Sequence, residues 1–88
     1  MKPIEWINKA KEKENIETDY KLAKMIGIKP SALVNIRKRN NGMDNFTAVR
    51  IAEILEINRM KIIIDMEIQK AKTKEKKEFW EKKEEIYL

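Results

Sequence analysis

Hydrophobic residues recur at spacings of three and four along most of the chain, a pattern that predicts successive short amphipathic helices. The first predicted helix covers residues 3–14, with Pro3 in its first turn. It is expected to end at Asn15, a residue type that tolerates the left-handed conformation. A second helix is predicted over residues 19–26, with Thr18 as its N-cap.

A third and a fourth helix are predicted next. Pro30 fixes the start of the third helix, because its missing N–H costs nothing at the first helical position. The inward-facing residues of this helix are expected to be Leu33 and Ile36. Asp44 is expected to cap a fourth helix that runs to about Ile57. Its buried face repeats at helical spacing and consists of Ala48, Ile51, Ala52 and Leu55.

The last third of the chain predicts two more helices. Asn58 is expected to cap the fifth, whose main apolar stripe consists of Met60, Ile63, Ile64, Ile68 and Ala71. Ile62 and Met66 project from nearly the opposite side, so another group must cover them. Thr73 is expected to cap a final helix of mixed charge. Its large apolar residues are Phe79, Trp80, Ile86 and Tyr87.

Length and composition favour one small all-α domain. Eighty-eight residues with 42% hydrophobic content are enough for one core and leave little room for a second. The chain has 40% charged residues, two glycines and two prolines, a composition that favours helices. We therefore predict a domain over residues 1–72. Residues 73–88 are predicted to form a C-terminal helix that packs on this domain or at a dimer interface.

The composition also excludes several kinds of chemistry. Cysteine and histidine are both absent, which removes thiolate ligands, the commonest zinc ligand and the commonest general base. We therefore expect no enzyme, no cofactor and no metal site. No apolar run approaches the roughly 20 residues of a membrane span. The early Glu5 and Trp6 are unlike a signal peptide, so we expect a cytoplasmic protein.

Positive charge is concentrated in one part of the chain. Between Tyr20 and Met43 there is no acidic residue, and this basic island contains Lys21, Lys24, Lys29, Arg37, Lys38 and Arg39. The whole chain carries +5 and the basic island +6, so the remaining residues sum to −1. Because the excess charge is local and falls on two short helices joined by a tight turn, it favours a nucleic-acid partner.

The segment LAKMIGIKPSALVNI, residues 22–36, resembles the helix-turn-helix of the Cro/CI-like (XRE) family of bacterial and phage regulators. The matching positions are Leu22, Ala23, Gly27, Ile28, Leu33 and Ile36. RIAEILEI, residues 50–57, is similar to the fourth-helix pattern of that family. The tail segment KAKTKEKKEFWEKK, residues 70–83, together with the upstream DYKLAKMIGI, resembles a family of small phage-related helix-turn-helix proteins of poorly defined function.

This resemblance implies a five- or six-helix lambda-repressor-like domain, with a helical C-terminal extension, that binds double-stranded DNA as a transcriptional regulator of phage or prophage origin. The recognition-helix positions of the family fall on Pro30, Ser31, Ala32, Asn35 and Lys38, with Lys29 and Arg39 near the DNA backbone. The Asn35 amide suits adenine, Ser31 is an adaptable hydrogen-bonding group, and Ala32 suits a thymine methyl. Lys29, Lys38 and Arg39 supply charge for phosphates.

The chain departs from the family pattern at three positions. Pro30 stands where many relatives have Gln, and Glu56 replaces a common glycine at the end of the fourth helix. Asp19 stands at a helix end that often meets phosphate, where a carboxylate is expected to repel the DNA.

Other interpretations of the same residues are open. Lysines and arginines on an exposed helix are often only a solvated face, and Asn35 can be an ordinary surface residue. Trp6, Phe79 and Trp80 are expected to be packing groups rather than platforms for stacked bases, because none lies in the basic island. The main rival function is an antitoxin or adaptor that acts through protein contacts of its C-terminal helices. A homodimer is expected for DNA binding, with Ile62, Met66, Phe79 and Trp80 as its interface.

Overall fold

The computed structural model describes residues 1–87, which form six α-helices and no strand. The predicted all-α class is therefore confirmed. The helices are α1 (Pro3–Lys13), α2 (Asp19–Ile26), α3 (Pro30–Arg39), α4 (Asn45–Leu55), α5 (Arg59–Lys70) and α6 (Lys74–Tyr87). Residue 88, the last of the predicted extension, lies outside the described residues.

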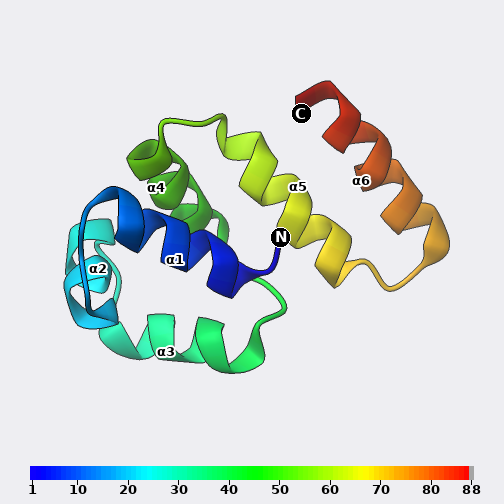
Figure 1. The fold of residues 1–88 in the computed structure, drawn as a ribbon. Coiled ribbons are helices and arrows are strands. Elements are labelled where there is room, and N and C mark those ends of the chain that lie inside the picture. The colour runs from blue at the N-terminus through cyan, green and yellow to red at the C-terminus, as the bar shows by residue number, and fades with distance from the viewer. Residues whose placement is uncertain (88) are drawn as a thin grey trace.

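Helices α1 to α4 form one end of the molecule and α5 leads away from them to α6 (Figure 1). Helices α2 and α3 pack against each other, and α1 contacts α2, α3 and α4. Helix α5 packs on α4, and α6 turns back along α5 (Figure 1). The radius of gyration is 13.0 Å, close to the roughly 12 Å expected for a compact domain of this length. None of the described helices is long and apolar enough to cross a membrane.

Side-chain caps begin four of these helices, each at the residue predicted from the sequence. The Thr18 hydroxyl accepts the N–H of Lys21 at 3.3 Å, and the Asp44 carboxylate accepts the N–H of Thr47 at 3.4 Å. Asn58 Oδ1 accepts the N–H of Met60 at 2.8 Å, and Thr73 Oγ1 accepts the N–H of Lys76 at 3.2 Å. These bonds satisfy N–H groups that have no partner within the helix.

Helix ends use the left-handed conformation at four positions. Gly27 has φ +93°, and three residues with side chains also have positive φ: Asn15, Asn40 and Glu56. Asparagine tolerates this conformation better than most residues. Glu56 has φ +58° and ends α4, in a conformation that glycine adopts at lower cost.

The core lies between α1, α2, α3, α4 and one side of α5. Its largest fully buried side chains include Ile7, Leu22, Ile26, Leu33 and Ile51. Leu22 and Ile26 come from α2 and Leu33 from α3, so the helix pair that carries the basic island is anchored by residues that are at most 1% exposed. Burial of each such side chain contributes roughly 1.5–3 kcal/mol to stability.

The predicted orientation of α5 is wrong. Ile62 and Met66 were expected to lie on the side of α5 opposite the core-facing stripe, at a homodimer interface. Both are instead buried and belong to the core. Ile64 is also buried, but it lines a cavity of about 270 Å³ beside Trp6 and Tyr87. Helix α5 is thus covered on two sides. The pair at positions 62 and 66 therefore packs inside the protein's own core and is not an interface for a second copy.

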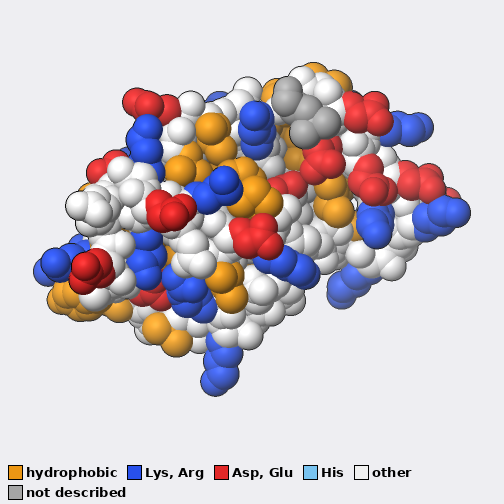
Figure 2. Space-filling view, in the orientation of Figure 1, with side chains coloured by type: hydrophobic (Ala, Val, Ile, Leu, Met, Phe, Trp, Pro, Cys, Tyr) orange, Lys and Arg blue, Asp and Glu red, His pale blue; other side chains and the backbone are white. Residues whose placement is uncertain are grey.

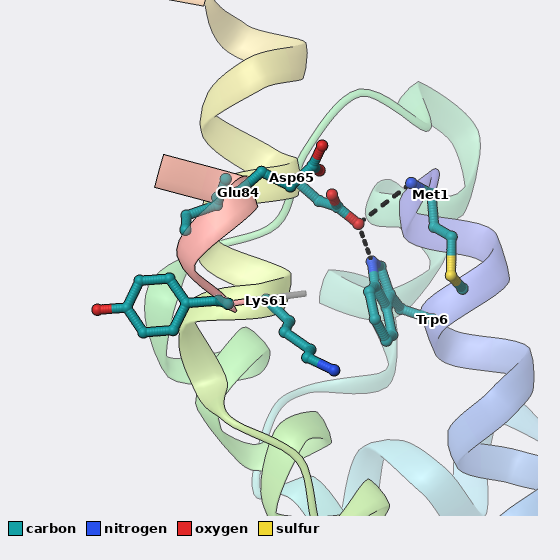
Figure 3. A pocket seen from close by; sticks show the side chains of 7 residues that line it. Met1, Trp6, Lys61, Asp65 and Glu84 are labelled. Atoms are coloured by element: carbon teal, nitrogen blue, oxygen red, sulfur yellow. Dashed lines mark hydrogen bonds and ion pairs between the residues drawn. The ribbon is translucent and has the colours of Figure 1, made fainter. Parts of the chain in front are cut away.

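A small polar cluster lies where α1, α5 and α6 meet (Figure 3). The Asp65 carboxylate accepts hydrogen bonds from Trp6 Nε1 at 3.0 Å and from the amino group of Met1 at 3.1 Å. Glu84 of α6 lies beside it. Partial burial raises the pKa of the Glu84 carboxyl, and neighbouring Asp65 raises it further. Trp6 is only 7% exposed, which confirms its expected packing role.

Candidate nucleic-acid interface

Helices α2 and α3 are joined by a three-residue turn. The N–H groups of Gly27 and Ile28 both donate to the Ala23 carbonyl, at 2.9 and 3.0 Å, and close the end of α2. The positive φ of Gly27 reverses the chain there, and Pro30 starts α3 two residues after Ile28. This geometry fixes how α3 lies relative to α2.

Arg50 of α4 ties the turn to the rest of the domain. Its guanidinium donates to the carbonyls of Met25 and Ile26, at 3.2 and 3.1 Å, which are among the last carbonyls of α2. These carbonyls have no partner within the helix, and a cation there also complements the negative end of the helix dipole. Arg50 also pairs with Glu53 at 3.0 Å. Arg50 is therefore a positioning residue, which the sequence analysis did not single out.

The outer face of α3 contains most of the predicted site. The predicted residues that are exposed are Lys29, Pro30, Ser31, Asn35, Lys38 and Arg39. Ala32 is half-buried and presents less surface than expected. On the opposite side, Leu33 is fully buried and Ile36 packs partly against the core. Base reading by these residues stays a prediction.

Val34 is a residue of this face that the sequence analysis missed. It is 56% exposed, although it is apolar and lies in the middle of α3. The helical period alone puts it there, one turn after Ser31 and one turn before Lys38, so the sequence did contain the signal. An exposed Val methyl is a suitable contact for a thymine methyl in the major groove.

The positive charge of Arg37 in the basic island is paired with the Asp19 carboxylate. Its Nε donates to Asp19 Oδ2, and its Nη2 donates to Asp19 Oδ1 at 2.9 Å and to Asn8 Oδ1 at 2.8 Å. Lys11 Nζ donates to Asp19 Oδ1 at 3.1 Å. Asp19 was expected to repel phosphate; in the structure its single negative charge is paired with two cations, Arg37 and Lys11.

The pKa of the Asp19 carboxyl is lowered, because Arg37 and then Lys11 hydrogen-bond to its charged form; partial burial opposes the shift. A lowered folded-state pKa contributes stability above the unfolded-state pKa, and this stability is lost as pH falls through the folded-state value. Replacement of Asp19 with Asn is expected to lower the free energy of unfolding at pH 7 by about 1–2 kcal/mol. Urea titrations should show that this difference shrinks as the pH falls through the lowered pKa of the Asp19 carboxyl.

The matched control for this prediction is Glu17→Gln, because Glu17 is an exposed carboxylate just before the same helix. The control is expected to change the free energy of unfolding by less than about 0.5 kcal/mol both at pH 7 and at acidic pH. A constant difference between wild type and Asp19→Asn down to strongly acidic pH would contradict the proposed role of this ion pair.

Five cations of the basic island are left, and each is exposed: Lys21, Lys24, Lys29, Lys38 and Arg39. Lys24 Nζ lies 5.2 Å from the ring centroid of Tyr20 on the same helix. Figure 2 shows hydrophobic, Lys and Arg side chains along the lower edge over α3, whereas acidic and basic side chains mix over α6. Helices α2 and α3 thus present a positively charged surface that suits a polyanion.

Other kinds of site have little support in residues 1–87. No cluster of three or more His, Cys, Asp or Glu side chains is placed to hold a metal ion.

Phe79 and Trp80 of α6 contact each other edge to face, with ring centroids 5.2 Å apart. Phe79 is 52% exposed, and Trp80 is half-buried.

Comparisons of the chain with protein-family models, with curated proteins and with solved structures found no match.

Proposed function

We propose that the protein binds double-stranded DNA through α3 as a sequence-specific, repressor-like transcriptional regulator of the Cro/CI-like kind. One observation carries the proposal: an acid-free helix with exposed Ser31, Asn35 and Lys38 on its outer face is held by a tight turn on a buried core. A helix with such a face fits the major groove, and its polar side chains meet base edges. The residues that match the helix-turn-helix pattern, Leu22, Ala23, Gly27 and Leu33, also support it.

The residues of this face have different roles in the proposal. Asn35 reads adenine, Ser31 and Val34 contact neighbouring base edges, and Lys38 binds a phosphate. Occupation of an operator by this surface would exclude polymerase sterically. A homodimer would present two copies of α3 to half-sites one helical turn apart.

The operator is obtained by selection of bound sites from random duplex DNA, and two substitutions then separate base reading from phosphate binding. Asn35→Ala is expected to lower the preference for the selected duplex over a scrambled one by about 1–3 kcal/mol, roughly 5- to 150-fold. Lys38→Ala is expected to weaken binding to both duplexes by the same factor. It should also make the slope of log affinity against log salt less steep by about 1. Competition binding measures both effects.

Lys9→Ala on the exposed side of α1 is the control for a lost positive charge, and it should leave both affinities unchanged. Equal losses on both duplexes for Asn35→Ala would show that Asn35 does not read a base. The stoichiometry of the complex on the selected site tests the expected homodimer.

The rival function, an antitoxin or adaptor that works through its C-terminal helices, has one observation in its favour. Phe79 is 52% and Ile86 68% exposed, and they lie seven residues apart on one face of α6. Ile62 and Met66 do not contribute to a docking surface on the C-terminal helices, because both are buried. Failure to select any duplex from the random pool would favour this rival.

A further inference from the structure

A second positively charged surface adjoins the exposed face of α3. It is an open groove of about 830 Å³ between the end of α3, the loop of residues 40–44 and the end of α5. Asn35 and Arg39 line its α3 side, and Lys70 and Lys72 line the opposite side. The proposed base reader and two lysines some 35 residues further along the chain therefore share one groove.

The groove carries net positive charge. Its acidic side chain is Asp44, whose carboxylate already accepts hydrogen bonds from the N–H and the hydroxyl of Thr47, at 3.4 and 2.6 Å. Against this single carboxylate the groove has three cations: Arg39, Lys70 and Lys72. Arg39 and Lys72 are exposed and form no ion pair within the described residues.

Contacts with the α3–α4 loop hold the side chain of Lys70 in place. Its Nζ donates to the Met43 carbonyl at 3.4 Å. Its aliphatic part packs on Gly42, where a Cβ atom would come within 2.8 Å of Lys70 Cε. This contact brings the start of the tail beside α3. From here the chain continues into further lysines of the tail at 72, 74, 76 and 77, with only Glu75 among them.

We propose that this groove binds backbone phosphates of the duplex that α3 reads, on the flank beyond the bases that α3 contacts. The proposal rests on the proposed DNA-binding function and extends its surface from the helix-turn-helix to Arg39, Lys70 and Lys72. Two features of the groove select a phosphate backbone as the occupant: its excess of positive charge and its continuity with the α3 face through Asn35. Phosphate contacts on both sides of α3 fix the register of the helix in the major groove.

The test is Lys72→Gln, because Lys72 is exposed and, unlike Lys70, has no hydrogen bond to the loop. At moderate salt this variant should bind the selected duplex and a scrambled duplex roughly 5- to 10-fold more weakly than wild type. The slope of log affinity against log salt should become less negative by about 0.9, the value for one phosphate contact. In an ethylation-interference assay, ethylation of one phosphate at the edge of the footprint should block binding of wild type but not of the variant.

Lys82→Gln is the matched control. Lys82 is an exposed lysine of the same tail, eight residues into α6 and so about 12 Å along its axis from the first helical residue. This control should retain wild-type affinity and slope. If wild type binds the selected duplex but Lys72→Gln matches Lys82→Gln in affinity, slope and footprint, the groove does not hold phosphate and the inference is overturned. A wild type that binds no duplex would instead overturn the proposed function.

Discussion

Affinity for the selected duplex is expected to fall about 500-fold as salt rises from about 50 to 200 mM. Each phosphate neutralised by Lys or Arg releases condensed counterions and adds about −0.9 to the slope of log affinity against log salt. The basic island presents five cations that form no ion pair within residues 1–87, because Arg37 is bound by Asp19. If all five meet phosphates, the slope is about −4.5, and contacts in the groove at Lys70 and Lys72 would steepen it.

Fluorescence anisotropy with a labelled duplex at a series of salt concentrations measures this slope directly. Lys24→Gln removes one exposed cation of α2, and Lys9→Gln serves as the control outside the basic island. The first variant should have a shallower slope and the second should match wild type. An affinity that does not change with salt would exclude the electrostatic mode of binding.

Replacement of Ile62 with Ala is expected to lower the free energy of unfolding by about 2–5 kcal/mol, because Ile62 has no exposed surface and the cavity left behind cannot close fully. A domain of this size has roughly 4–13 kcal/mol of stability in total. The variant should therefore unfold at a much lower urea concentration, measured by circular dichroism.

Ile86→Ala is the control, because Ile86 loses the same atoms from a side chain that is 68% exposed. It should change the free energy of unfolding by less than about 0.5 kcal/mol. The pattern of the sequence alone favoured the opposite result at position 62, namely a substitution that breaks a dimer and leaves the domain folded. Equal stability of the Ile62→Ala and Ile86→Ala variants would restore that earlier interpretation.

Features that depend on local sequence were predicted well. The caps at Thr18, Asp44, Asn58 and Thr73 all begin helices, because each acts on an N–H two or three residues away. Pro30 and the residues around it likewise place the start of α3 without any tertiary information. The all-α class and the positions of the helices follow from such signals.

Features that depend on tertiary contacts were predicted less well. Helix α5 is covered on two sides, so its hydrophobic pattern has no single stripe and cannot reveal which side meets α4. Arg37 counted toward the basic island until the fold brought Asp19 to it, from 18 residues earlier in the chain. The groove also depends on the fold, because Lys70 reaches Met43 across 27 residues.

Helix α6 has a consequence for how the molecule opens. None of its described side chains is buried, and none belongs to the core that joins α1 to α5. Release of α6 would uncover Ile64 and part of Trp6 but leave the rest of that core covered, so native-state fluctuations can release it at a free energy below that of complete unfolding. The five inner helices and the outer helix then form two cooperative units. Slow amide hydrogen exchange would be confined to the inner unit.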